Sequence, residues 1–478
     1  MGRTTYATGG EWTPGWKGAG SNPSVGPATK TDESLGRKDI DMTRVPRSLA
    51  GSGKLKGLAA LLTGLAFAAA CGGGANSGSN NGSSTTSNGP VSISIGLPAQ
   101  SIILPPKLLQ EFEQKYPNIS VTTYPTHWGD WPAKLQALNA AGQTPTVFLY
   151  DGGTVQGYGA KGLALDLNGF LSHSQLQSSQ YINLRYSQDP KGHVWGIPQA
   201  YQPVALAYNK SLFDQAGVSY PTDQWTWSDM VSAATKLTQK NKQCGLITDH
   251  DITAGWLPFI WANGGEPFNS AITQANFNAP KVQQGVAQWQ QLVQQGVVCN
   301  ESTIQANRND LTQVFGKGLG AMFLMQYGQV GGVLQSFPQL NWDVAPLPRG
   351  VINRIPNIAN PWVIYKHATP AQQQAAWTFI EWWLSPQVEN EYATMGYAVP
   401  DLVSAAASFP SSPAHLKAAY VDAIAKYGHT MYESATWGDW EAVAEPLFLQ
   451  IFEGQMSTND GLQQVNSAVN GVLSGSAG

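Results

Sequence analysis

Large aromatic rings beside polar side chains are the feature of this sequence with the clearest chemical meaning. Of the 17 tryptophans, 15 follow residue 70. Those in polar turns are Trp128 and Trp131, Trp256 and Trp261, Trp362, and Trp437 and Trp440. A flat indole ring packs on the C–H face of a sugar, and neighbouring carboxylates and amides hydrogen-bond the sugar hydroxyls. The collection therefore indicates a site for a neutral sugar, although each ring taken alone fits a structural role better.

Motifs for catalysis or metal binding are missing from the sequence. It has no H-E-x-x-H, C-x-x-C or G-x-S-x-G, so we expect no catalytic triad, metal or cofactor. Residues 157–162 match G-x-G-x-x-G but follow a predicted helix and precede a strand-like run, the reverse of a dinucleotide-binding loop. Asp249-His250-Asp251 could touch a cation, but a solvated turn is the favoured interpretation. A carboxylate pair for glycoside cleavage stays open, because acidic residues are plentiful.

Strand and helix patterns alternate along the first part of the body. Apolar residues alternate over 91–95, a helical stripe follows over about 105–116, and a strand follows at 119–121. A second helix includes Leu135 and Leu138, and a third strand covers 147–150. This order predicts an α/β fold with a largely parallel sheet, whose ligands bind beyond the carboxyl ends of the strands.

Three later helices are predicted from caps and apolar stripes. Thr226 and Asp229 form a capping-box pattern, and a long helix runs from about Thr369 to Leu384. The last predicted helix contains Val443, Leu447 and Ile451.

An export signal precedes the body. Basic residues lead into an apolar segment over 57–70, which is too short to span a bilayer and ends at Cys71. The pattern resembles a bacterial lipoprotein box, with Ala68 where the box usually has leucine. We therefore expect residues 1–70 to be an upstream extension and signal peptide, and 71–90 to be a lipidated Cys71 with a flexible linker. Ordinary cleavage after Ala70, giving a secreted protein, is the alternative.

Cys244 and Cys299 are the only other cysteines. In an oxidising extracytoplasmic setting, an even pair suggests one disulfide. Two buried free thiols are the alternative.

The charge balance argues against a nucleic-acid partner. After residue 70 the chain holds 18 basic and 26 acidic residues, which makes a mildly acidic surface. No later run of about 18 apolar residues appears, so membrane contact is expected only through the lipid on Cys71.

Several stretches in order resemble the extracellular solute-binding proteins of ATP-driven sugar importers, the family of maltose-binding protein. They cover Phe112–Ile119, Gly192–Pro198, Leu206–Gly217, Trp227–Asp229, Asn263–Gly265, Phe315–Met322 and Phe379–Pro386. The sequence departs from the family at Thr146, where aspartate is common, and at Tyr327, where tryptophan is frequent.

The resemblance implies the two-lobe periplasmic-binding-protein fold of type II, each lobe a mostly parallel sheet flanked by helices. The N-terminal lobe would comprise 91–202 and 358–412, and the C-terminal lobe 203–357 and 413–478. A ligand would lie in the cleft between them, and closure would present a loaded surface to the permease.

The resemblance also implies which residues face the cleft. These are Gln100, Trp128, Asp130, Tyr150 and Asp151 from the first lobe, Tyr201, Trp256, Tyr327, Trp437 and Trp440 from the hinge and second lobe, and Trp362 near the return crossing. Stacking is assigned to Trp437 or Trp440, Tyr327 and Trp256. Asp130 and Asp151 would accept hydrogen bonds from sugar hydroxyls.

The resulting expectation is a monomeric, lipid-anchored, extracytoplasmic protein that captures a sugar or oligosaccharide for ABC transporter permease subunits, without catalysis. A secreted glycosidase would share the aromatics and the signal, and a binding protein for an oligopeptide or polyamine is a further alternative.

Overall fold

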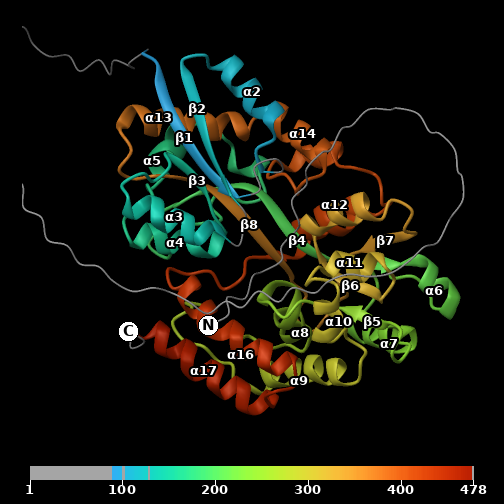
Figure 1. Ribbon diagram of the computed structural model, residues 1–478. Helices are drawn as coiled ribbons and strands as arrows, with labels where there is room; N and C mark the ends of the chain where they lie inside the picture. The colour runs from blue at the N-terminus through green and yellow to red at the C-terminus, as the bar shows by residue number, and fades with distance from the viewer. Residues whose placement is uncertain (1–88, 99–102, 127–129, 476–478) are drawn as a thin grey trace, which may run out of the picture. The chain divides into compact units, whose positions relative to one another are not determined.

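Two long strands, β4 (Ile197–Asn209) and β8 (Ile355–Ile364), run through the middle of the computed structural model, which describes residues 89–98, 103–126 and 130–475 (Figure 1). They pair antiparallel, with Tyr201 opposite Ala359 and Pro203 opposite Asn357. Beyond Pro203, β4 pairs instead with β6 and β7. One strand therefore belongs to the sheets of both lobes.

The remaining strands are arranged on either side of this central pair. They are β1 (Val91–Pro98), β2 (Ile119–Thr126), β3 (Val147–Leu149), β5 (Cys244–Ile247), β6 (Gly320–Gln326), β7 (Trp342–Ala345) and β9 (Gly428–His429). The order is β2-β1-β3-β8-β4-β6-β5, with β7 paired to β4 and β9 to β8. We call the part built on β1, β2 and β3 the first lobe, and the part built on β5, β6 and β7 the second lobe.

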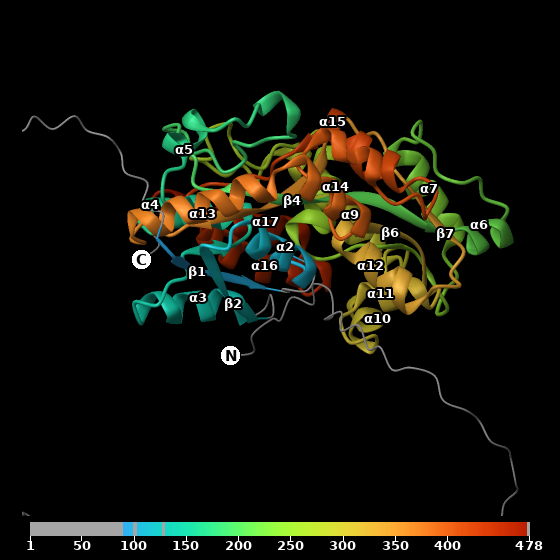
Figure 2. The ribbon, with the colours of Figure 1, turned by 90° about the horizontal axis from the view of Figure 1, so that it is seen from above.

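Helices flank both groups of strands (Figure 2). Those of the first lobe are α2 (Pro106–Lys115), α3 (Trp131–Ala140), α4 (Gly152–Ala160), α5 (Asn168–His173), α13 (Pro370–Trp383) and α14 (Pro386–Met395). Those of the second lobe are α6 (Lys210–Ala216), α7 (Trp227–Leu237), α8 (Leu257–Ala262), α9 (Pro280–Gln294), α10 (Glu301–Ala306), α11 (Leu311–Gly316), α12 (Tyr327–Ser336), α15 (Ala423–Tyr427), α16 (Trp437–Phe452) and α17 (Thr458–Leu473).

Local sequence signals account for several helix starts. Thr226 accepts a hydrogen bond from the amide of Asp229, whose carboxylate accepts one from the amide of Thr226, as the capping-box pattern predicted. Thr369 and Gln372 form the same arrangement at the start of α13. Both helices then bury the apolar face that follows the cap.

Two expectations about the fold were wrong. The sheet is mixed rather than mostly parallel, because every pairing of β4 and the pairing of β3 with β8 are antiparallel. The helix containing Val443 is also not the last, since α17 follows it. The apolar stripe of α17, with Leu462, Val465 and Val469 buried, is diluted by glycine and asparagine.

Two large apolar cores and one small cluster hold the body together. One core draws its buried residues from 93–200 and 362–405. The other draws them mainly from 201–355 and 409–469, with Tyr186, Ala359 and Val399 joining it from the first-lobe segments. The small cluster, built around Trp131 and Phe148, lies on the first lobe. The chain therefore passes between cores at β4, at β8 and after residue 405.

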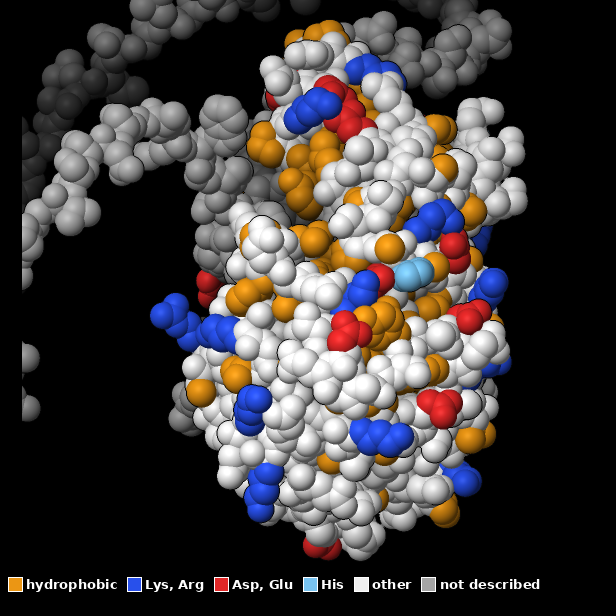
Figure 3. Space-filling model, turned by 90° about the vertical axis from the view of Figure 1, so that its right-hand side faces the viewer, with side chains coloured by type: hydrophobic (Ala, Val, Ile, Leu, Met, Phe, Trp, Pro, Cys, Tyr) orange, Lys and Arg blue, Asp and Glu red, His pale blue; other side chains and the backbone are white. Residues whose placement is uncertain are grey.

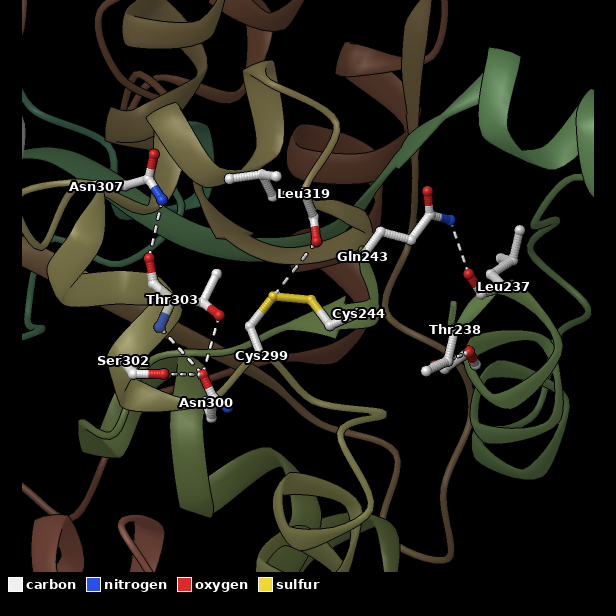
Figure 4. Close-up of a disulfide and its surroundings, with 11 residues drawn as sticks. Leu237, Thr238, Gln243, Cys244, Cys299, Asn300, Ser302, Thr303, Asn307 and Leu319 are labelled. Carbon is white, nitrogen blue, oxygen red and sulfur yellow. Dashed lines mark hydrogen bonds between the residues drawn. A yellow bond between two sulfur atoms is a disulfide. The ribbon is translucent and has the colours of Figure 1, made fainter. Parts of the chain in front are cut away.

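Cys244 and Cys299 form a disulfide, the pairing that the sequence analysis favoured (Figure 4). It joins the start of β5 to the residues before α10, and the two Cα atoms lie 5.1 Å apart. Both cysteines are buried, and Sγ of Cys299 lies 3.8 Å from the carbonyl oxygen of Leu319. The bond closes a loop with a sequence separation of 55 residues.

Charged side chains of both signs are mixed on one face of the molecule. Within the described ranges, no helix has the length and apolar character to cross a bilayer. On the face drawn in Figure 3, basic and acidic side chains are scattered among each other.

Removing the disulfide should destabilise the second lobe without preventing folding. We expect Cys244→Ala combined with Cys299→Ala to lower the free energy of unfolding by about 2–5 kcal/mol, because an open loop of this size gains entropy when unfolded. Urea unfolding followed by tryptophan fluorescence measures the change. An unchanged midpoint would show that the bond contributes nothing.

Candidate functional site

The first lobe contributes polar groups where β3 ends. Tyr150 and Asp151 follow the strand directly, and Asp151 is the N-cap of α4. The Asp151 carboxylate accepts hydrogen bonds from the amide and the hydroxyl of Thr154, both at 2.9 Å. Burial nevertheless raises the pKa of Asp151, while these bonds act to lower it. The half-buried carboxyl is thus held rigidly at the edge of the sheet where ligands bind in such folds.

At this edge of the sheet, an indole ring of the second lobe contacts the first lobe. Trp437 begins α16, and its ring lies against Gly153 so closely that a Cβ on Gly153 would be 2.4 Å from it. Trp437 is 4% exposed, and it meets Trp440 edge to face with ring centres 4.8 Å apart. Because Gly153 has no side chain, the two lobes can close until this ring touches the backbone.

Acidic side chains follow Trp437 on the same face of α16. Glu441 lies one turn later and Glu445 one turn after that, at i, i+4 and i+8. Burial and the charges of Asp151 and Asp251 raise the pKa of Glu441 to about 8. Because the ring of Trp437, one turn earlier, contacts Gly153 of the first lobe, the half-buried Glu441 lies next to the junction between the lobes.

The loop after β5 adds a second pair of carboxyls. Asp251 caps the short helical segment Ile252–Trp256 by accepting a hydrogen bond from the amide of Ala254 at 2.8 Å, and Gln326 donates to it at 3.3 Å. Burial and the charge of Asp249 raise the pKa of Asp251. His250 Nδ1 lies 3.4 Å from Asp249. In the part of the chain that the structure describes, no group of three His, Cys, Asp or Glu side chains could hold a metal.

Tyr201 and Tyr327 occupy the hinge region. Tyr201 on β4 donates from its hydroxyl to the carbonyl of Asn183 at 3.2 Å. Tyr327 begins α12 and donates to the carbonyl of Gly396 at 3.0 Å, which links the second lobe to the first. Both side chains are buried, so their present role is to hold the crossing strands.

A further buried acid joins the two lobes behind α4. Glu433 precedes α16, and its carboxyl is hydrogen-bonded to the hydroxyl of Tyr186, which also lies 3.0 Å from the carbonyl of Asn357. Burial raises the pKa of Glu433 well above its usual range, and the Tyr186 bond opposes this. The second carboxyl oxygen has no partner among the described residues.

Grooves flank this contact between α4 and the start of α16. One has a volume of about 370 Å³ and is lined by α3, α4 and the start of α16, including Thr154, Tyr158 and Asp439. The other has a volume of about 780 Å³ on the opposite side of α4 and includes Arg185, Trp195 and Glu433. Solvent therefore reaches the lobe junction from both sides of α4.

Among the other residues predicted to face the cleft, three tryptophans lie inside the cores and one aspartate lies at an exposed helix start. Trp256 is fully buried, with its ring stacked on Phe448 at 4.2 Å between centres. Trp440 is buried against Phe268, and Trp362 lies inside the core of the first lobe against Phe379 and Trp383. Asp130 is exposed at the start of α3. Gln100, Trp128 and Cys71 lie outside the described residues.

Sequence reasoning missed Glu441, Glu445 and Glu433. A signal for the first two existed, because they continue the spacing of Trp437 on a face whose other members are apolar. Acidic residues on the buried face of a helix are rare unless they are paired. Nothing local marks Glu433, whose partner Tyr186 is 247 residues away.

The chain has relatives among proteins that capture solutes. The sn-glycerol-3-phosphate-binding periplasmic protein UgpB of Agrobacterium fabrum is 24% identical over 280 residues, which are 54% of this chain and 61% of that protein. The chain spans about three-fifths of the length of the curated relatives that it matches.

Solved structures share the two-lobe fold. The ABC substrate-binding protein Lmo0181 of Listeria monocytogenes, in complex with cycloalternan, has a TM-score of 0.71 at 22% identity, over 80% of this chain and 99% of that chain. The cyclic alpha-maltosyl-1,6-maltose binding protein of Arthrobacter globiformis has a TM-score of 0.68 at 20% identity, over 81% of this chain and 100% of that chain. Residues 107–418 match the family model of bacterial extracellular solute-binding proteins. The chain therefore belongs to the family of bacterial extracellular solute-binding proteins.

Proposed function

We propose that this protein captures a sugar or oligosaccharide between its lobes outside the cytoplasm and delivers it to an ABC transporter. The observation that carries the proposal is the contact of the Trp437 ring with Gly153 of the first lobe, next to Asp151 and one turn before Glu441. An indole face beside fixed hydrogen-bond acceptors suits a polyhydroxylated ring. Membership in a solute-binding family agrees with this chemistry.

Binding would be coupled to closure about the strands that both lobes share. β4 and β8 cross the boundary as a paired ribbon, so bending there moves the lobes as bodies. A ligand that touches Asp151 on one side and Glu441 on the other binds the closed form better than the open one. Such a difference in affinity shifts the population toward the closed state that the permease would recognise.

Among the aromatic residues, Trp437 is the proposed stacking partner. Its ring lies at the surface where the lobes meet, whereas Trp256 and Trp440 are packed inside the second lobe and Trp362 inside the first. Opening the lobes would uncover one face of Trp437 at the position now occupied by Gly153.

The proposed reaction is capture without chemical change. Asp151 and Asp251 are tied to backbone amides at helix starts, and this suits them as acceptors for hydroxyl groups rather than as mobile proton donors. A saccharide recovered unaltered after saturating binding would agree with this role, whereas released shorter products would indicate a glycosidase.

The proposed location is the outer face of the cell membrane, through a lipid on Cys71. The signal-like segment before Cys71 and the Gly, Ser and Asn-rich run after it support this arrangement. A monomer is proposed, with permease subunits as the partners.

Replacing Trp437 with alanine should weaken saccharide binding. We expect a loss of about 1–3 kcal/mol, the range of an aromatic anchor in a buried contact, measured by calorimetry with the best of a panel of mono- and oligosaccharides. Trp225→Ala is the control, because Trp225 packs near Phe213 on a distant part of the second lobe. Equal affinities for the two variants would remove Trp437 from the site.

Adding a methyl group at Gly153 should hinder closure. A Cβ there would lie 2.4 Å from the Trp437 ring, so we expect Gly153→Ala to weaken saccharide binding and to shift small-angle X-ray scattering of the loaded protein toward the open form. Gly169→Ala is the matched control on helix α5, because a Cβ there meets nothing within 4 Å. Closure of the Gly153→Ala variant equal to that of the control would contradict the hinge model.

Replacing Cys71 with serine should release the protein from membranes while leaving saccharide affinity unchanged, because the serine hydroxyl is not a lipid acceptor. Fractionation of cells that express the full chain measures the release. Persistent membrane association of the variant would exclude the lipid anchor.

A further inference from the structure

The residues that precede α16 lie along the glycine-rich helix α4 of the first lobe. A Cβ on Gly157 would be 2.9 Å from the carbonyl oxygen of Ala435, and the segment ends at Trp437 with the ring contact already described. Glu433, two residues before Ala435, is hydrogen-bonded to the hydroxyl of Tyr186. The side chain of Glu433 therefore anchors this second-lobe segment to the first lobe.

Tyr186 connects the carboxyl of Glu433 to a strand that both lobes share. The ring of Tyr186 packs against Gly152 at the start of α4 and meets the ring of Tyr201 on β4 edge to face. Its hydroxyl lies 3.0 Å from the carbonyl oxygen of Asn357 on β8. Pro203, which is opposite Asn357 on β4, has no amide hydrogen to donate to that carbonyl. The hydroxyl thus lies between a carboxyl of the second lobe and the crossing strand.

The number of protons at these contacts indicates the state of Glu433. The hydroxyl of Tyr186 has a single proton, and the carbonyl oxygen of Asn357 can only accept one. Two hydrogen bonds need two protons, so the second proton belongs to the carboxyl of Glu433. The carboxyl then donates to the phenol oxygen, and the phenol donates to the carbonyl.

The surroundings of Glu433 also favour the neutral carboxyl. Its side chain is 8% exposed, and its second oxygen has no hydrogen-bond partner among the described residues. None of the ion pairs in that part of the chain includes it. An ionised carboxylate is costly in such a place, because a single bond would have to stabilise its charge. Burial raises the pKa of Glu433, the Tyr186 bond opposes this, and the charge of Asp151 adds to it.

We infer that Glu433 is a positioning residue for closure, which donates a proton to Tyr186 and so ties the second lobe to β8. We call the chain of bonds from Glu433 through Tyr186 to Asn357 the latch. This inference rests on the proposed closure of the lobes and not on the identity of the ligand. Opening of the lobes would carry Glu433 away with the second lobe and leave Tyr186 bonded to Asn357.

Loss of the proton from Glu433 releases the latch. A carboxylate accepts hydrogen bonds but does not donate, so the single proton of Tyr186 is left for two acceptors. Water solvates the negative charge when the lobes separate, and rising pH therefore shifts the population toward the open form.

Several titratable groups face Glu433 from both lobes. Tyr186 and Asp151 act on it directly. The two grooves that Glu433 lines also contain the ion pairs of His193 with Asp189 and of Arg354 with Glu266, together with Arg185, Lys191, His429 and Tyr432.

Infrared difference spectra of the full chain at about pH 7 test the protonation of Glu433. Subtraction of the Glu433→Gln spectrum from that of the wild type should reveal the absorption of a protonated carboxyl. Glu453→Gln, at the exposed end of α16, is the control and should remove the absorption of an ionised carboxylate instead. An ionised carboxylate lost in Glu433→Gln would overturn the inference.

Small-angle X-ray scattering of the protein without saccharide tests whether the latch holds the lobes together. Tyr186→Phe keeps the ring and removes the hydroxyl, so we expect a larger radius of gyration than in the wild type. Glu433→Gln retains a donor and should be as compact as the wild type. Tyr427→Phe, at an exposed position in α15, is the control and should also match the wild type. Equal radii of the wild type and Tyr186→Phe would contradict the latch.

A pH series from about 5 to about 9 separates the proton from the other contacts of Glu433. The wild type should expand as pH rises, whereas Glu433→Gln has no carboxyl to ionise and should stay compact. A raised pKa in the folded state gives stability that is present at low pH and lost as pH rises. In urea unfolding, the unfolding equilibrium constant of the wild type should therefore rise faster than that of Glu433→Gln, by up to about tenfold per pH unit for one proton.

The outcomes of these measurements separate the latch from saccharide capture. Parallel pH profiles of the wild type and Glu433→Gln would overturn the inference, because no proton at Glu433 would then be linked to closure. No saccharide is used in any of the three measurements. Failure of the saccharide panel to bind would therefore count against the proposed function and leave the latch standing.

Discussion

The antiparallel pairing of β4 with β8 is the constraint on which the other features depend. Because β4 continues past Pro203 into the second sheet, one backbone fixes the direction in which the lobes face each other. The chain that follows β3, the strand next to β8, therefore brings Gly153 against Trp437 at the start of α16. The hydroxyls of Tyr201 and Tyr327, which bind backbone carbonyls of the first lobe, hold the crossing without filling the space beyond it.

Closure brings together groups that each lobe prepares separately. Asp151 is ordered by Thr154 within α4, and Asp251 by the amide of Ala254, so neither carboxylate depends on the other lobe for its position. An edge-to-face contact with Trp440 holds the ring of Trp437 in position, and Trp440 is itself packed in the core of the second lobe. Gly153 and Gly157 adapt to the partner lobe by having no side chain, since a Cβ on Gly157 would lie 2.9 Å from the carbonyl oxygen of Ala435. Such preorganisation keeps low the entropy that a ligand must overcome.

The sequence predicted local elements well and their assembly less well. The capping boxes at Thr226 and Thr369 involve residues three positions apart, so the pattern alone locates them. Sheet direction depends on the partner of β4, which lies about 150 residues further along the chain, and no local pattern encodes it. Trp256 and Trp437 also lie in similar polar surroundings in the sequence, yet Phe448 covers one ring while the partner lobe covers the other.

The spacing of Trp437, Glu441 and Glu445 shows how one helix can serve both packing and recognition. Positions four apart stack on one face, and the neighbours of these residues on that face, Trp440, Ala444 and Phe448, are apolar and buried. A helix built only for stability would continue the apolar stripe, because an unpaired buried carboxyl lowers stability. Each of the two acids lies beside an indole, because Trp437 acts to lower the pKa of Glu441 and Trp256 acts to lower that of Glu445, against the effect of burial.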